Sequence, residues 1–169
     1  GVLESTAGEG EDADRSARSV KTIVITDVVG STRTVERVGD RASGELLCSH
    51  ERLTRDVLVL FGGEEIDTAG DGVLASFDSA TSAIDYARSL LGRIGELGLE
   101  LRVGIHTGEL ELVEGSARGI ALHVASRIAA RAAPGEILVS ATTRELAAGA
   151  GLVFVDRGTH TLKGVSEPR

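Results

Sequence analysis

The sequence predicts an α+β fold in which helices pack on a largely antiparallel sheet. Strand and helix patterns alternate along the chain, which indicates a layered architecture. A hairpin pattern interrupts the alternation, and doubly wound parallel sheets lack such hairpins in their core. The chain has 169 residues, of which 41% are hydrophobic and 26% charged, enough for one domain with a core.

The predicted elements follow in the order β-α(α)-β-β-α-β-α-β-α-β, and the first six resemble a ferredoxin-like βαββαβ core. β-branched runs and alternation predict strands, whereas apolar residues at helical spacing predict helices. The strands are expected at 20–29, in a hairpin over 64–77, at 99–114 as one long strand or a pair, and at 136–140, 152–158 and 160–164. The helices are expected within 31–60, with a break near Gly39-Asp40, and at 78–97, 119–133 and 141–148.

Residues 1–19 differ from the rest of the chain. They lack hydrophobic periodicity and are rich in Glu, Asp, Gly, Ala and Ser, which predicts a flexible acidic tail or linker. Residues 20–169 are predicted to form one domain.

Charge and composition exclude several classes of partner. The net charge of −8, the pI of about 5.0 and an aromatic content of 2% disfavour binding to nucleic acid or anionic membranes. No apolar run is long enough to span a membrane, so any tether would have to lie outside these residues. Cys48 is the only cysteine, which excludes an internal disulfide, and its helical surroundings predict a core or half-buried thiol. A cytoplasmic location fits these features, in this chain alone or as part of a larger protein.

Two carboxylates are placed where they can act together. Asp27 ends the first apolar strand, just before a Gly30-Ser31-Thr32 turn, and a carboxylate there is costly to bury unless it is paired or binds a cation. Asp71 lies in the Gly-Asp-Gly turn of the hairpin. Each carboxylate also has a purely structural interpretation. Asp27 would cap the following helix, and Asp71 would only stabilise the turn. If the hairpin lies beside the first strand, both carboxylates emerge at one edge, near a helix N-terminus, as suits Mg²⁺ or Mn²⁺ holding phosphates.

Five segments carry a family resemblance. "ITDVVGSTR", "DTAGDGVLASF", "RVGIHTGELE", "GIALHVASRIA" and "HTLKG" occur in this order. Together they resemble the catalytic domain of class III nucleotidyl cyclases, in particular an actinobacterial branch with divergent substrate-selecting residues, over about residues 20–166. The resemblance implies the class III cyclase fold and conversion of ATP to 3′,5′-cyclic AMP and pyrophosphate.

The resemblance also implies a two-metal site. Asp27 and Asp71 match the aspartates that bind two divalent cations, Mg²⁺ or Mn²⁺, and the carbonyl of Val28 matches a further ligand. The amides of Gly30, Ser31 and Thr32 would bind phosphate oxygens at the start of a helix.

Two cationic residues match phosphate-binding positions. Arg127 matches the arginine that stabilises the α-phosphate in the transition state, a role that suits a planar, permanently charged guanidinium. Lys163 matches the lysine that contacts the terminal phosphates. Without the resemblance, both would be read as solvated surface residues.

Three positions depart from typical adenylyl cyclases. Asp67 replaces the base-contacting lysine, Ser116 occupies the Asp or Thr position, and His123 replaces the transition-state asparagine. An ionised Asp67 accepts hydrogen bonds, from the adenine amino group or from guanine nitrogens. Guanylyl cyclases place Glu there, whereas relatives with His at the 123 position look like adenylyl cyclases with relaxed selectivity. ATP is the favoured substrate, with GTP or relaxed selectivity as the alternative.

The resemblance further implies a head-to-tail homodimer whose two active sites each draw residues from both chains. His123 and Arg127 lie one helical turn apart and are expected to line the same pocket. The alternative from another class is a catalytically weak, regulatory cyclase homologue that binds nucleotide without turnover. His106, flanked by Gly104 and Gly108, is predicted to be structural, at a place of close backbone packing.

Overall fold

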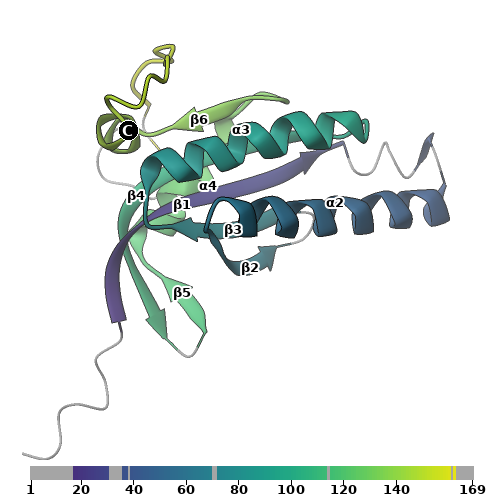
Figure 1. Ribbon diagram of the computed structural model, residues 1–169, viewed down its shortest axis with the longest axis horizontal. Helices are drawn as coiled ribbons and strands as arrows, with labels where there is room; N and C mark the ends of the chain where they lie inside the picture. Colours follow the sequence, from purple (N-terminus) through teal and green to yellow (C-terminus); the bar gives the residue numbers. More distant parts are fainter. Residues whose placement is uncertain are drawn as a thin grey trace, which may run out of the picture.

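The computed structural model describes residues 17–30, 36, 37, 39–69, 72–113, 115–160 and 162. Its elements follow the predicted order closely (Figure 1). The strands are β1 (Ala17–Val29), β2 (Glu64–Ala69), β3 (Gly72–Phe77), β4 (Glu100–Val113), β5 (Ser116–Arg118) and β6 (Ile137–Val139). The helices are α2 (Asp40–Leu60), α3 (Ala80–Glu96), α4 (Ile120–Arg131) and α5 (Ala141–Leu146).

One sheet forms the centre of the molecule. Its strands run in the order β2-β3-β1-β4-β5, all neighbours being antiparallel, and β6 pairs with β4 in parallel. The arrangement β1-α2-β2-β3-α3-β4 is the predicted βαββαβ core, and the α+β fold prediction is confirmed. Beyond the helices, the start of β1 and the β4–β5 hairpin extend together as a ribbon (Figure 1).

One face of the sheet carries α2 and α3, which run side by side (Figure 1). Large side chains fill the layer between them and the sheet, among them Phe77, Leu90 and Ile94. The Tyr86 ring lies against Phe77, with ring centroids 5.0 Å apart. This layer is the main hydrophobic core, because most of the buried apolar residues belong to it.

The opposite face of the sheet carries α4, which packs on β4 and β1. Ile23 and Leu110 are buried on this face, but where α4 crosses β4 the contact is made by small residues. A Cβ added at Gly104 would lie 2.6 Å from the Ala129 Cα, and one added at Gly108 would lie 2.9 Å from the Ala121 Cβ. The glycines therefore allow α4 to approach the strand closely, as predicted from their positions around His106.

His106 belongs to a buried chain of polar side chains. Its Nδ1 lies 2.7 Å from the Ser140 Oγ, which is 3.2 Å from the Thr143 Oγ1. Thr143 in turn contacts Thr107 at 3.0 Å, and Thr107 contacts Thr22 at 2.9 Å. The chain joins β1, β4 and the start of α5, which agrees with the structural role predicted for His106.

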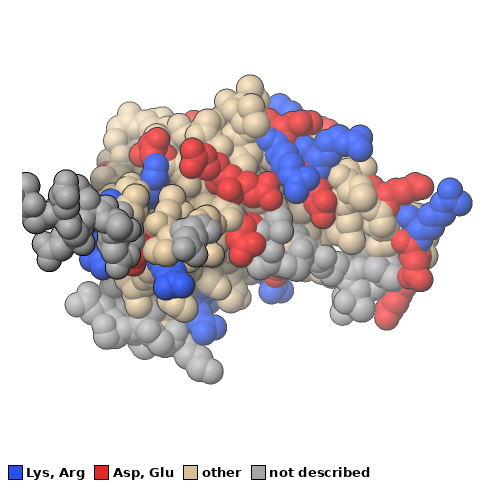
Figure 2. All heavy atoms as spheres, turned by 90° about the horizontal axis from the view of Figure 1, so that it is seen from below, with Lys and Arg blue, Asp and Glu red and all other residues tan. Residues whose placement is uncertain are grey.

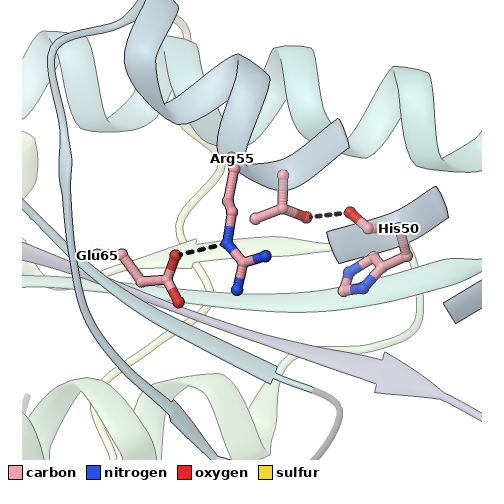
Figure 3. A network of polar contacts seen from close by, with 4 residues as sticks. His50, Arg55 and Glu65 are labelled. Atoms are coloured by element: carbon pink, nitrogen blue, oxygen red, sulfur yellow. Dashed lines mark hydrogen bonds and ion pairs between the residues drawn. The ribbon is translucent and has the colours of Figure 1, made fainter. Parts of the chain in front are cut away.

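The helix α2 begins where the sequence predicts a break. Gly39 precedes it with φ of 83°, a conformation that favours glycine. Within α2 the Thr54 hydroxyl donates to the His50 carbonyl, and the Arg55 Nε lies 3.2 Å from the Glu65 Oε2 on β2 (Figure 3). This ion pair ties the helix to the strand that carries Asp67.

The structure corrects one expectation about α2. Cys48 is exposed, whereas a core or half-buried thiol was predicted. The buried stripe of the helix includes Ser43, His50, Thr54 and Val57, and Cys48 lies outside it. The prediction was wrong because the helical repeat places Cys48 on the solvent side of α2, away from these buried positions.

Three other differences concern strands. No strand forms over 152–158. Leu152 and Phe154 pack on the core and Val153 points outward, so the alternation is present without a strand partner among the described residues. β5 was not predicted separately, and β1 begins at Ala17, inside the predicted tail. Of the predicted strand 160–164, only 160 and 162 are described.

Among the described residues, no helix combines the length and apolar character needed to cross a membrane.

Candidate active site on the α4 face of the sheet

Asp27 lies near the end of β1 with an exposed side chain. Side chains alternate along a strand, so Asp27 shares a face with Ile23 and Ile25, which pack in the cluster under α4. Its neighbour Val28 points the other way into the main core and is 5% exposed. The core therefore fixes the backbone at this strand end, while the carboxylate stands on the α4 face.

The hairpin lies beside this strand end, as the sequence prediction required. β1 and β3 pair antiparallel with Thr26 opposite Val73. The Thr26 hydroxyl also accepts a hydrogen bond from the Val73 amide at 3.2 Å. The start of β3 is thus held against the end of β1. Asp71 itself lies outside the described residues.

Arg102 is a candidate that sequence reasoning missed. It lies on β4 directly opposite Asp27 in the antiparallel register. Paired residues point to the same face, so its guanidinium belongs to the side that carries the carboxylate. Its Nε is buried and has no hydrogen-bond partner among the described residues. A buried guanidinium donor without a partner is costly, which favours an anionic ligand at this place.

Asp67 lies on the same face as Asp27. It is exposed on β2, just after an irregularity in the β2–β3 register, and pairs with Leu74. Leu74 packs with the cluster under α4, and this fixes the face. β3 separates β2 from β1, so about 10 Å lie between the strands of Asp67 and Asp27. At that separation, an extended ligand can reach Asp67 with one end and Asp27 with the other.

His123 and Arg127 lie on the outer side of α4. The buried side of the helix includes Val124, Ala125 and Ile128, whereas His123 and Arg127 are exposed and one turn apart. Neither makes a hydrogen bond or ion pair with the described part of the chain. The structure thus confirms that they share a helix face, and this face points away from the chain's own sheet.

The remaining predicted residues are placed only in part. Ser116 is exposed at the start of β5. Gly30 follows β1 with φ of 71°, in a turn that favours glycine. Ser31, Thr32 and Lys163 lie outside the described residues.

The donor chemistry suits a hard cation. Asp27 offers carboxylate oxygens, makes no ion pair within the described ranges and lies at a strand end. Among the described residues, no three His, Cys, Asp or Glu side chains are grouped closely enough to hold a metal. The second carboxylate predicted for a cation at Asp27 is Asp71, which lies outside the described ranges. On the side shown in Figure 2, described acidic and basic side chains lie interspersed, so that side presents no broad basic surface.

Comparison with known protein families shows which family the chain belongs to. The model of the adenylate and guanylate cyclase catalytic domain matches residues 15–169. The chain belongs to this family. The resemblance stated from the sequence is therefore confirmed at the level of the family, and the position of Asp27 can be interpreted within a cyclase domain.

Individual relatives agree with this assignment. An adenylate cyclase of Streptomyces coelicolor is 31% identical over 149 residues, covering 85% of this chain and 39% of the relative. An adenylate cyclase of Streptomyces griseus is 31% identical over 141 residues, covering 82% of this chain and 34% of the relative. The crystal structure of the adenylyl cyclase CyaB from P. aeruginosa superposes with a TM-score of 0.81 at 24% identity, covering 90% of this chain and 91% of that one. This last likeness concerns the fold.

The curated relatives are much longer than the matched region. The chain spans between 17% and 39% of the length of the first ones it matches. The family assignment thus describes a catalytic domain, which in these relatives forms part of a larger protein.

Proposed function

We propose that this chain is an adenylate cyclase domain that converts ATP to 3′,5′-cyclic AMP and pyrophosphate. The observation that carries the proposal is the pair of Asp27 and Arg102 at one strand end, on the face over which α4 lies. A carboxylate beside a guanidinium whose Nε has no hydrogen-bond partner among the described residues is suited to bind a metal–triphosphate complex, because the two groups match its opposite charges.

The proposed reaction is an in-line displacement at the α-phosphorus. The ribose 3′-oxygen forms a bond to this phosphorus, the bond to the bridging oxygen of the β-phosphate breaks, and the 3′-hydroxyl proton leaves to solvent. Asp27, Asp71 and the Val28 carbonyl would hold two divalent cations, Mg²⁺ or Mn²⁺. When bound, such cations lower the pKa of the attacking hydroxyl and neutralise the leaving pyrophosphate.

Cationic residues of the chain would stabilise the phosphates. Arg102 projects from the strand beside Asp27, and Arg127 offers planar donors that suit charge developing on the α-phosphate. Lys163 would bind the terminal phosphates. The amides of Gly30, Ser31 and Thr32 would bind phosphate oxygens at the turn after β1.

Asp67 and His123 would select the base, with Ser116 as a further polar contact. The position of Asp67 on β2, about 10 Å from β1, suits a base at the far end of a bound nucleotide. Its carboxylate would accept a hydrogen bond from the adenine amino group, and the names of the relatives favour ATP. Guanylyl cyclase activity or relaxed selectivity is the alternative, since guanine also presents donors to an acid.

A second copy of the chain would complete each site. His123 and Arg127 are exposed on the outer side of α4, while Asp27 belongs to the sheet beneath. In a head-to-tail homodimer, the outer side of α4 from one chain would face Asp27 of the other. A monomer would then be inactive, and activity would rise with the fraction of dimer.

The test is product formation from ATP and from GTP, each with Mg²⁺ and with Mn²⁺, over a series of protein concentrations. The proposal expects cyclic AMP as the main product and a rate per chain that rises with concentration. Cyclic GMP as the main product would assign Asp67 to guanine instead. If the dimeric chain forms neither product, the domain is a regulatory cyclase homologue that binds nucleotide without turnover.

A further inference from the structure

An irregularity in β2 lies directly before Asp67. Glu65 lies opposite Ala75 in β3, and Asp67 lies opposite Leu74, so β2 advances two residues where β3 advances one. The extra residue is Ile66, and the irregularity is therefore a β-bulge. A bulge bends its strand and redirects the residues beyond it, of which Asp67 is the first.

The bulge places Glu65 and Asp67 on opposite faces of the sheet. Residues paired across strands point to the same face. Ala75 belongs to the main core under α2 and α3, whereas Leu74 packs with the cluster under α4. In a regular strand, residues two apart would share a face. The bulge thus lets Glu65 face α2 while Asp67 stands on the face of the proposed nucleotide site.

The helix α2 holds the strand before the bulge. The Arg55 Nε lies 3.2 Å from the Glu65 Oε2, and the two side chains point toward each other from helix and strand (Figure 3). The Glu65 side chain is 28% exposed, so solvent screens this ion pair less than a fully exposed one. The Gly63 amide, just before β2, donates to the Leu58 carbonyl at 3.0 Å. Of these two contacts, the ion pair lies nearer to the bulge.

The hairpin turn sets the register of the other half of β2. Ala69 pairs with Gly72 beside the turn, and the pair of Asp67 and Leu74 continues that register. The register at Glu65, which contacts α2, differs from it by one residue, and Ile66 accommodates the difference. Once Glu65 is released from Arg55, the whole strand can adopt the register of the turn, which removes the bend at Asp67.

We propose that Arg55 and Glu65 are positioning residues that maintain the bulge in β2 and thereby direct Asp67 toward the base of the bound nucleotide. The inference rests on the proposed function, because that function gives Asp67 its contact with the base. Arg55 and Glu65 lie on the α2 side of the sheet, so they touch no substrate and act through the backbone of β2. Loss of their ion pair should therefore change the preference between ATP and GTP.

The experiment measures base preference in R55A, E65Q, D67A, the double variant R55A/D67A and the exchange R55E/E65R. Base preference is the ratio of kcat/KM for ATP to kcat/KM for GTP. It is also measured without turnover, as the ratio of the dissociation constants of 3′-deoxy-ATP and 3′-deoxy-GTP, which lack the attacking hydroxyl. R41A is the matched control, because the Arg41 Nε pairs with Glu45 at 3.8 Å within α2 itself. Thermal unfolding checks that each variant is folded.

D67A is expected to shift the ATP-to-GTP ratio about tenfold, as for loss of a hydrogen bond to a charged group. R55A and E65Q should shift it about threefold to fivefold in the same direction, the factor that one such ion pair contributes. R55E/E65R restores opposite charges and should return the ratio to within about twofold of wild type, and R41A should leave it unchanged. Because Arg55 acts through Asp67, adding R55A to D67A should cause no further shift.

A wild-type ratio in R55A and E65Q would overturn the inference. A further shift of the ratio in R55A/D67A would also overturn it, since Arg55 would then act by another route, and so would a wild-type ratio in D67A. Failure of the proposed function gives a different result. If the wild type makes no cyclic nucleotide, while R55A and D67A shift the ratio of dissociation constants in the same direction, catalysis is refuted and the positioning role is supported.

Discussion

The two faces of the sheet differ in what their side chains do. The face under α2 and α3 buries large apolar residues such as Phe77, Leu90 and Ile94. The face under α4 buries fewer large residues, such as Ile23 and Leu110, and glycines let the helix approach β4; around that contact lie Asp27, Arg102 and the outward His123 and Arg127. More large apolar residues are buried under α2 and α3 than under α4, so substitutions there should cost more stability. Substitutions on the face under α2 and α3 should therefore mainly change the free energy of unfolding, and substitutions on the α4 face should mainly change kcat.

The largest expected effect is on activity from the α4 face. D27N keeps the shape of the side chain but removes its charge, so cation binding at the strand end should be lost. We expect kcat to fall about a thousandfold or more, with the thermal unfolding midpoint nearly unchanged because the residue is exposed. Turnover assays and calorimetric melting measure the two quantities. Activity within tenfold of wild type would contradict the assignment.

The opposite result is expected from the main core. Leu90 is fully buried on α3, so L90A should lower the free energy of unfolding by about 2–5 kcal/mol. Urea titration measures this loss. At a temperature where the variant remains folded, kcat per chain should stay within about twofold of wild type, since the α4 face is untouched. A stable but inactive L90A variant would contradict the claim that the main core affects stability and not kcat.

Gly104 tests the contact between β4 and α4. A methyl group there would lie 2.6 Å from the Ala129 Cα, so G104A must displace the helix that carries Arg127. We expect a loss of about 1–3 kcal/mol in stability together with a clear drop in kcat. The matched control is G92A on α3, where a Cβ meets nothing within 4 Å. That variant should gain roughly 0.5–1 kcal/mol and keep full activity. Equal stability and equal kcat of G104A and G92A would show that close packing under α4 is unimportant.

The smallest effect concerns Tyr86 and appears at alkaline pH. Burial, with a further contribution from Glu65, raises the pKa of the Tyr86 hydroxyl above its ordinary value. The unfolded chain then loses this proton near pH 10 while the folded chain keeps it, so Tyr86 lowers stability as the pH rises beyond about 10. Y86F should remove this part of the alkaline decline. It should cost little at pH 7, because the hydroxyl has no hydrogen-bond partner among the described residues.

Local patterns predicted most of the fold. The Gly39 break, the hairpin around Gly-Asp-Gly and the glycines flanking His106 were read correctly, since each depends on a few neighbouring residues. The strand predicted over 152–158 failed because alternation reports burial and does not reveal whether a strand partner exists.

The site was predictable only where a family motif or a turn marks it. Asp27 ends an apolar strand, and His123 and Arg127 share a helical repeat, so sequence alone suggested them. Arg102 was missed because its proximity to Asp27 comes from the register of β1 with β4, which residues far apart in the chain determine. A charged residue in an otherwise apolar strand was the signal available.

The most direct test of a site shared between two copies on the α4 face is complementation. D27N and R127A are each expected to be nearly inactive, since each removes one half of every site. Mixing equal amounts produces heterodimers in which one site has lost both residues and the other has both intact. We predict that the mixture recovers about a quarter of wild-type cyclic AMP formation, since half of the dimers carry one intact site of two. A mixture as inactive as its components would contradict a shared site on this face.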